Sequence, residues 1–112
     1  MSFKVTIGLR ARRVENWIRA VQRDYLDNAP IKCVVLDCEF TNSREGDQRA
    51  AVLQLSAESE NLVFLICHAD EVTQLLMEFL QDGTIRFYGE AIGKDCEMLS
   101  PYGIHITYAY DL

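Results

Sequence analysis

The 112-residue chain is 49% hydrophobic and 25% charged with a net charge of −6, a composition typical of one globular domain. It has no apolar run of the roughly 20 residues that a membrane span needs and does not start with the apolar core of a secretory signal. We therefore expect an intracellular protein, nuclear or cytoplasmic, with no membrane partner.

The charge is unevenly distributed along the chain. Residues 1–32 hold seven basic and three acidic residues, a net charge of +4, which leaves −10 for the remainder. An acidic majority argues against broad affinity for nucleic acid, because that affinity comes mainly from lysine and arginine. The basic segment forms either a local binding patch or an ordinary solvated helix face.

The first predicted elements are a strand and a helix. Apolar and polar side chains alternate over residues 3–9, which predicts a half-buried strand. Apolar residues then recur at helical spacing, so residues 12–26 are predicted to form an amphipathic helix with Trp17 in its buried stripe. The segment 27–30 contains Pro30 and ends this helix.

Three strands follow in the prediction, joined by short polar turns. The strands cover residues 32–40, 50–56 and 62–67, and the turns cover 41–49 and 58–61. Short turns favour antiparallel neighbours, so we expect an antiparallel meander.

The apolar pattern then changes to the helical period. Apolar residues between Val72 and Leu80 predict a helix that Asp70 caps and Asp82-Gly83 ends. A strand over 85–89, a helix over 92–100 and a last strand over 104–110 follow. This order predicts an α/β fold with a mixed sheet, a three-strand meander and then helix, strand, helix and strand, preceded by its own strand and helix.

The cysteines are predicted to be buried free thiols. They form no CxxC pair and lie mostly in apolar runs, which argues against zinc ligands and disulfides. The four are Cys33, Cys38, Cys67 and Cys96.

Two carboxylates interrupt the predicted strand 32–40. Asp37 and Glu39 are two residues apart, and strand side chains alternate between faces, so both point the same way. Two adjacent buried carboxylates are unfavourable unless a cation or hydrogen bonds compensate for the lost water. A hard divalent metal is the natural candidate, and a pair of strand-end acids facing solvent is the alternative.

A third acid, Asp95, lies six residues after Gly89 and four before Leu99, where on its own it could be an exposed helix acid. The strand with Asp37 and Glu39, the strand Leu53-Gln54-Leu55 and this spacing around Asp95 together resemble the DEDD 3′–5′ exonucleases. The resemblance is to the RNase D and Werner-type branch, in particular to its small plant proteins. Further matching pieces are the helix ending at Leu80, the strand ending at Gly89, and Tyr102-Gly103-Ile104 leading to Asp111-Leu112.

The resemblance implies an RNase H-like fold in which residues 1–112 form a single domain, with 1–31 as a strand and helix extension and 32–112 as the core. It implies hydrolysis of nucleotides from the 3′ ends of DNA or RNA with two divalent cations, Mg²⁺ or Mn²⁺. Asp37, Glu39 and Asp95 would be the catalytic residues and metal ligands.

The sequence departs from the family at two motifs. The third motif, a Tyr or His followed by a final Asp, should lie beyond Leu112, so we expect a C-terminally truncated core that lacks its C-terminal third and the fourth ligand. Cys38-Glu39-Phe40 stands where relatives have an aliphatic residue, Glu and Trp. Asp111 matches a recurrent acid at the end of the last family strand and is expected to be structural.

These departures lead to two expectations. The isolated chain should be a weak or inactive exonuclease, because it lacks a ligand and an acid–base group, and the alternative is a catalytically dead domain that binds protein or nucleic acid. Missing cover should also expose apolar surface, which we expect a second copy or another protein to bind.

Overall fold

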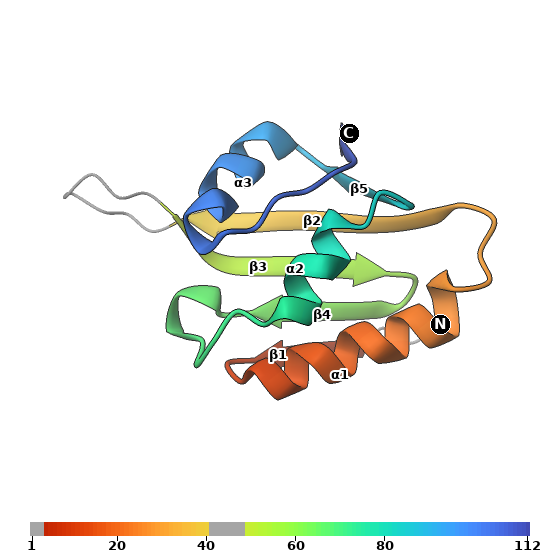
Figure 1. The fold of residues 1–112 in the computed structure, drawn as a ribbon, viewed down its shortest axis with the longest axis horizontal. Coiled ribbons are helices and arrows are strands. Elements are labelled where there is room, and N and C mark those ends of the chain that lie inside the picture. The colour runs from red at the N-terminus through yellow and green to blue at the C-terminus, as the bar shows by residue number, and fades with distance from the viewer. Residues whose placement is uncertain (1–3, 41–48) are drawn as a thin grey trace.

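The computed structural model describes residues 4–40 and 49–112, so the predicted turn at 41–49 lies outside the described residues except at its last position. A six-stranded sheet forms the centre of the molecule, with the strands in the spatial order β1-β4-β3-β2-β5-β6 (Figure 1). The strands are β1 (Lys4–Gly8), β2 (Lys32–Phe40), β3 (Ala50–Ala57), β4 (Glu60–Phe64), β5 (Ile85–Gly89) and β6 (Ala109–Asp111).

The predicted meander is confirmed, and the rest of the sheet is parallel. β2 pairs antiparallel with β3, and β3 pairs antiparallel with β4. β1 adds to β4, β5 adds to β2, and β6 adds to β5, in each case in parallel orientation. The result is the mixed α/β sheet that the order of elements predicts.

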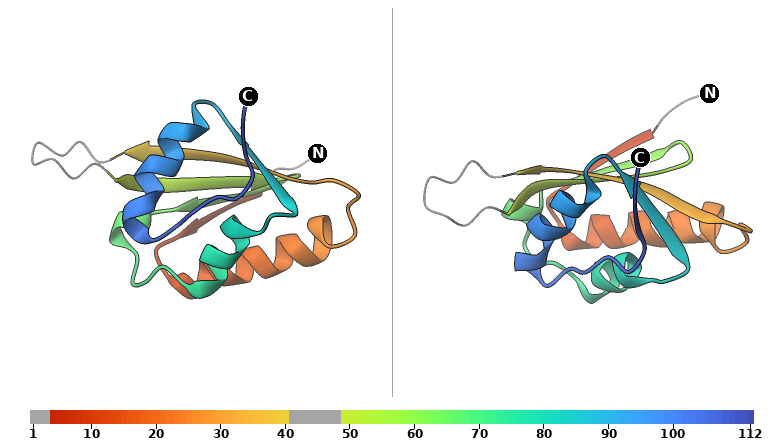
Figure 2. Two further views of the ribbon diagram at one scale, coloured as in Figure 1. Left: turned by 45° about the horizontal axis from the view of Figure 1, so that its top comes forward. Right: turned by 90° about the horizontal axis from the view of Figure 1, so that it is seen from above.

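The α-helices cover one face of this sheet (Figure 2). α1 (Ala11–Val21) packs against β1 and β4, α2 (Gln74–Gln81) packs against α1, and α3 (Ile92–Leu99) packs against β2 and β3. Short helical segments at Gln22–Leu26 (η1), Ile66–His68 (η2) and Ser100–Tyr102 (η3) complete the set. The helix predicted over 12–26 is therefore an α-helix that continues as one π-helical turn.

The hydrophobic core lies between the helices and the covered face of the sheet. Val34, Leu36 and Cys38 alternate along β2 as its buried residues, and Trp17 lies in the buried stripe of α1 as predicted. Phe79 of α2 meets Phe87 of β5 edge to face, with ring centroids 5.6 Å apart. Burial of these large side chains supplies most of the driving force for folding.

The other face of the sheet carries exposed apolar side chains. Val5 and Ile7 of β1 are each 60% exposed, and Val35 of β2 is also exposed. The first predicted strand thus presents its Val and Ile to solvent rather than to the core, because α1 lies against the face that carries Lys4 and Thr6. The prediction of a half-buried strand at 3–9 was wrong about which side chains are buried.

Two further details differ from the sequence-based expectations. Asp70 does not cap α2, since its Oδ1 accepts a hydrogen bond from the backbone N–H of Ala11 at 2.8 Å, at the start of α1. Thr73 caps α2 instead, with its hydroxyl accepting from the N–H of Leu76. The last strand, predicted over 104–110, covers only Ala109–Asp111, and the segment between η3 and this strand is irregular. No helix in the described part of the chain is both long enough and apolar enough to cross a bilayer.

Candidate functional site

The candidate site lies where β5 ends and α3 takes its place beside β2. β5 pairs with β2 only over Lys32–Val35, whereas β2 continues to Phe40, and α3 packs along this second half of the strand (Figure 1). Gly89 is the last residue of β5, and a Cβ on it would lie 2.5 Å from the carbonyl oxygen of Leu36. Only glycine lets the backbones of β5 and β2 approach this closely, so this residue fixes where the chain leaves β5 and enters α3.

The start of α3 is held by the last strand. The backbone N–H of Ile92 donates a hydrogen bond to Oδ1 of Asp111 at 2.9 Å, and the N–H of Leu112 donates to the carbonyl of Gly89 at 3.0 Å. Ala91, just before the helix, adopts the left-handed conformation with φ 50°. Asp111 thus satisfies one of the donors left free at a helix start, which is the structural role predicted for it.

Asp95 is the buried charged residue of the described chain. It lies on the inner side of α3 and is 2% exposed. Its Oδ2 is buried and receives no hydrogen bond from any described residue. A buried carboxylate oxygen with no donor and no cation is unfavourable. The burial of Asp95 excludes its interpretation as an exposed helix acid.

Asp37 lies close enough to Asp95 for their charges to interact. Burial, and then the charge of Asp37, raise the pKa of Asp95 to about 6. Asp37 itself is exposed, and its Oδ1 accepts a hydrogen bond from the N–H of Cys38 at 3.0 Å. The structure therefore brings together two predicted acids that are far apart in the sequence.

Glu39 shares the exposed face of β2 with Asp37, as the alternation of the strand predicts, but the expected burial of the pair is wrong because this face of β2 is uncovered. Asp37 pairs with Gln54 of β3 and Glu39 with Val52, and the register shifts directly after Glu39. Across residues 4–40 and 49–112, however, no three His, Cys, Asp or Glu side chains are close enough to form a group that could hold a metal ion. Glu39 is thus on the predicted face without converging on the same point as Asp37 and Asp95.

The cysteines near this site are packing residues. Cys38 points into the core, and burial together with the charge of Asp95 raises the pKa of its thiol. Burial also raises the pKa of half-buried Cys96. The cysteines were predicted to be buried, but only Cys38 is: Cys67 and Cys96 are half-buried, and Cys33 is exposed because it lies on the uncovered face of β2.

The donor set fits a hard divalent cation in two respects. Mg²⁺ and Mn²⁺ prefer carboxylate oxygens, and the unpaired Oδ2 of Asp95 beside the charge of Asp37 is the arrangement that a cation stabilises. The Cβ that glycine lacks at position 89 would lie 3.6 Å from this same oxygen, so the end of β5 lies directly beside the Asp95 carboxylate.

Comparisons with known proteins agree with this geometry. No family model matches the chain, and no curated protein matches it. Among solved structures, the EXD2 exonuclease domain soaked in Mg and dGMP superposes with a TM-score of 0.82 at 19% identity, covering 97% of this chain and 56% of that one. The chain has the RNase H-like fold of an exonuclease domain.

Other structures of the same domain give consistent values. The EXD2 exonuclease domain in a further structure has a TM-score of 0.81 at 23% identity, covering 97% of this chain and 57% of that one. The domain soaked in Mn and Mg has a TM-score of 0.77 at 25% identity, covering 97% and 55%. The predicted fold is confirmed, and the chain spans a little over half the length of these exonuclease domains.

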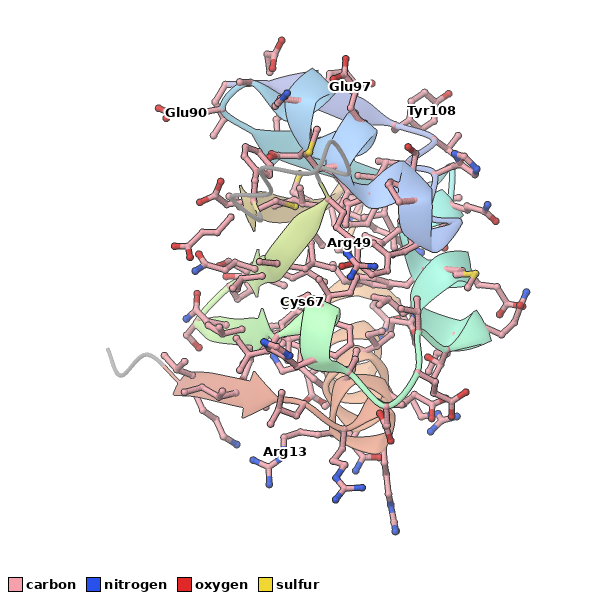
Figure 3. All side chains as sticks on the ribbon, turned by 90° about the vertical axis from the view of Figure 1, so that its left-hand side faces the viewer. Arg13, Arg49, Cys67, Glu90, Glu97 and Tyr108 are labelled. Atoms are coloured by element: carbon pink, nitrogen blue, oxygen red, sulfur yellow. The ribbon has the colours of Figure 1, made fainter. Side chains whose placement is uncertain are left out.

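Two contacts of the structure, at Gly89 and at Tyr102, have no signal in the sequence. The absent side chain of Gly89 allows close contact with β2. Arg49 lies over the ring of Tyr102 (Figure 3). The hydroxyl of Tyr102 donates a hydrogen bond to the carbonyl of Ala50, the first residue of β3. The sequence carries no signal for these contacts, since they join segments about fifty residues apart.

Proposed function

We propose that this chain is a domain of the 3′–5′ exonuclease family that hydrolyses nucleotides from the 3′ ends of nucleic acid with Mg²⁺ or Mn²⁺, and that its activity in isolation is weak because the third motif is absent. Asp37, Glu39 and Asp95 are the proposed ligands. The observation that carries the proposal is the buried, unpaired Oδ2 of Asp95 next to the charge of Asp37, in the fold of an exonuclease domain. The structures of EXD2 domains soaked in Mg and in Mn support the choice of cation.

The residues of this chain have separate parts in the proposed site. Asp95 offers an oxygen that has no other partner, and exposed Asp37 offers its carboxylate from the neighbouring strand. Glu39 lies two residues further along the same face of β2 as Asp37. When bound, divalent cations supply Lewis acidity to a phosphodiester and neutralise the charge that develops on it. Gly89 and Asp111 hold α3 at the distance from β2 that the two acids need.

A nuclease assay tests this proposal. A 5′-labelled oligonucleotide is incubated with the protein and Mn²⁺, and with EDTA in a parallel sample. We expect slow shortening from the 3′ end that requires the metal and is lost in Asp37→Ala, an exposed position whose change should leave the fold intact. Glu97→Gln removes an exposed acid from α3 and serves as the control that keeps activity. Shortening that persists in Asp37→Ala would contradict the proposed ligands.

A second candidate function is a domain that binds nucleic acid or protein without catalysis. It is favoured by one observation: in the described residues Glu39 does not converge with Asp37 and Asp95 into a three-ligand group. In the assay above, this function predicts that the wild type and Asp37→Ala are equally inactive while both still bind the oligonucleotide.

We further propose that another protein surface covers the exposed apolar face of the sheet. In the purified protein this surface belongs to a second copy of the chain. Val5 and Ile7 stand on this face of the edge strand β1, and Val63 lies beside Ile7 on β4. Exposed apolar patches of this kind mark interaction surfaces in proteins that are stable in solution.

A further inference from the structure

A pocket of about 540 Å³ lies between β1 and the start of α1, at the edge of the sheet far from the candidate metal site. Its volume is in the range of small-ligand sites. One part of its wall is cationic and another part, formed by Trp17, Ala20 and Val21, is apolar. The charged side chains that line it are Lys4, Arg10, Arg12, Arg13 and one acid, Glu60.

Most of the positive charge at this pocket is uncompensated. The ion pairs found among the described residues join Arg19 to Glu15 and Arg23 to Asp24, so none of them uses a cation of the pocket. Arg10 lies near Asp70 and helps to lower the pKa of that carboxyl, after the larger effect of the hydrogen bond from Ala11. Arg12 and Arg13, both exposed, therefore remain available to an anion.

Trp17 adds a second, independent sign of a ligand. It lines the pocket, it is 5% exposed, and its indole N–H is buried without an acceptor in the described part of the chain. Buried N–H donors are nearly always paired, so the orphan donor of a residue that lines this pocket indicates a missing acceptor. The buried side-chain atoms without partners among the described residues are this N–H and Oδ2 of Asp95.

The charge of the whole molecule makes this location distinctive. The pocket belongs to the segment with a net charge of +4, whereas the remaining residues carry −10. Arg13 lies at the opposite end of the molecule from Glu90 and Glu97 (Figure 3). β1 and β2 are three strand spacings apart, which corresponds to about 14 Å. A polyanion would be repelled by most of the surface and attracted here.

We infer that the pocket between β1 and α1 binds a nucleotide unit of a single-stranded nucleic acid. Arg12, Arg13 and Lys4 contact the phosphate, and an oxygen of the ligand accepts the indole N–H of Trp17. The apolar wall beside Trp17 takes the sugar or the base, which a paired strand would not offer. The inference deepens the proposed function, on which it rests for the class of ligand, by giving the strand a contact away from the metal ligands.

Fluorescence tests the inference directly because Trp17 is the sole tryptophan of the chain. The protein is titrated in EDTA with oligothymidylate of about eight nucleotides, and binding is followed both by tryptophan emission and by anisotropy of a labelled strand. We expect a saturable change in emission that follows the anisotropy and weakens with salt. Binding by anisotropy without a change in emission, or no binding at all, overturns the inference.

Matched charge variants locate the binding. Arg12→Gln/Arg13→Gln should weaken affinity about tenfold and reduce the slope of log affinity against log salt by roughly 1.4, for two lost phosphate contacts. Arg19→Gln/Arg23→Gln removes the same charge from exposed positions outside the pocket and should change affinity less than twofold to threefold. Equal losses in the two pairs would mean diffuse attraction and would overturn the inference.

Two further samples test whether the ligand is a strand or a free nucleotide, and whether binding at the pocket is independent of the metal site. Thymidine monophosphate should bind more weakly than the oligonucleotide, and equal affinity would show a site for free nucleotides instead of a strand. Glu97→Gln, which keeps the proposed metal ligands, should bind in EDTA like the wild type, since no metal takes part. Failure of the nuclease assay therefore leaves this result unaffected, and failure here leaves the metal site unaffected.

Discussion

At the scale of single residues, two buried side-chain atoms in the described chain have no hydrogen-bond partner. They differ in the sign of the charge that lies nearby. Oδ2 of Asp95 is an acceptor near a second carboxylate, which favours a cation. Nε1 of Trp17 is a donor on a residue that lines a pocket with several cations, which favours an anion. Because unpaired buried groups are costly, both positions are better explained by ligands than by packing alone.

Asp95 makes the stability of the metal-free protein depend on pH. Its pKa is about 6 in the folded protein, above the ordinary value of about 3.9, so the folded state binds more protons than the unfolded state between these values. This contribution to stability is complete below about pH 4 and is lost as the pH rises through about 6. Asp95→Asn should therefore flatten the decline and raise the unfolding temperature at pH 7.

Thermal unfolding in EDTA across this pH range measures the effect. Glu97→Gln, an exposed acid on the same helix, should retain the wild-type decline. A wild type whose stability does not fall between pH 4 and 6, or an Asp95→Asn variant with an unchanged profile, would show that the carboxyl is not buried as described.

At the scale of elements, the site depends on how closely α3 approaches β2. Gly89→Ala places a Cβ against the backbone oxygen of Leu36, which cannot move as a flexible side chain would, and should cost about 1–3 kcal/mol. Gly93→Ala, within α3, meets nothing within 4 Å and should stabilise the protein by about 0.5–1 kcal/mol. Urea unfolding of both variants tests this opposite pair of effects, and equal midpoints would contradict it.

The contact between β6 and α3 can be tested separately. Asp111→Ala removes the acceptor for the N–H of Ile92 and should cost about 1 kcal/mol, as losses of helix N-caps do. Asp111→Asn keeps an acceptor oxygen and should be close to the wild type. Chemical unfolding distinguishes them, and similar losses in both variants would mean that the charge of Asp111 rather than the hydrogen bond is important.

The elements themselves could be predicted from periodicity, because the strand and helix patterns are strong in β2, β3 and α2. Asp37 and Glu39 could be placed on one face of β2 for the same reason. The partner of Asp70 could not be predicted, since a helix cap is expected nearby in sequence and Ala11 is 59 residues away. The shortness of β6 also had no local signal, because its pairing with β5 decides its length.

At the scale of the whole molecule, sequence patterns could not show which side of β1 faces the core. Val5 and Ile7 have the alternation of a half-buried strand, yet α1 packs on the opposite side, where Lys4 and Thr6 help to form the basic pocket. The position of α1 on this side of β1 therefore both exposes the apolar face and forms the pocket. The basic patch left open as an alternative in the sequence thus has a specific place in the fold.

The exposed face predicts self-association. Analytical ultracentrifugation at tens of micromolar should show a dimer or larger species for the wild type. Val5→Thr/Ile7→Thr keeps β-branched residues in an exposed strand but makes the face less apolar, so it should shift the distribution toward monomer without unfolding the chain. A strictly monomeric wild type would contradict this part of the account.

The central claim is that Asp37 and Asp95 form a cation site, and calorimetric titration with Mn²⁺ at pH 7 tests it most directly. We predict saturable binding to the wild type and to Glu97→Gln, with binding weakened at least about tenfold in Asp37→Asn and Asp95→Asn, as for lost metal-site groups. Circular dichroism confirms that each variant is folded. Identical Mn²⁺ binding in all four proteins, or no binding in the wild type, would contradict the claim.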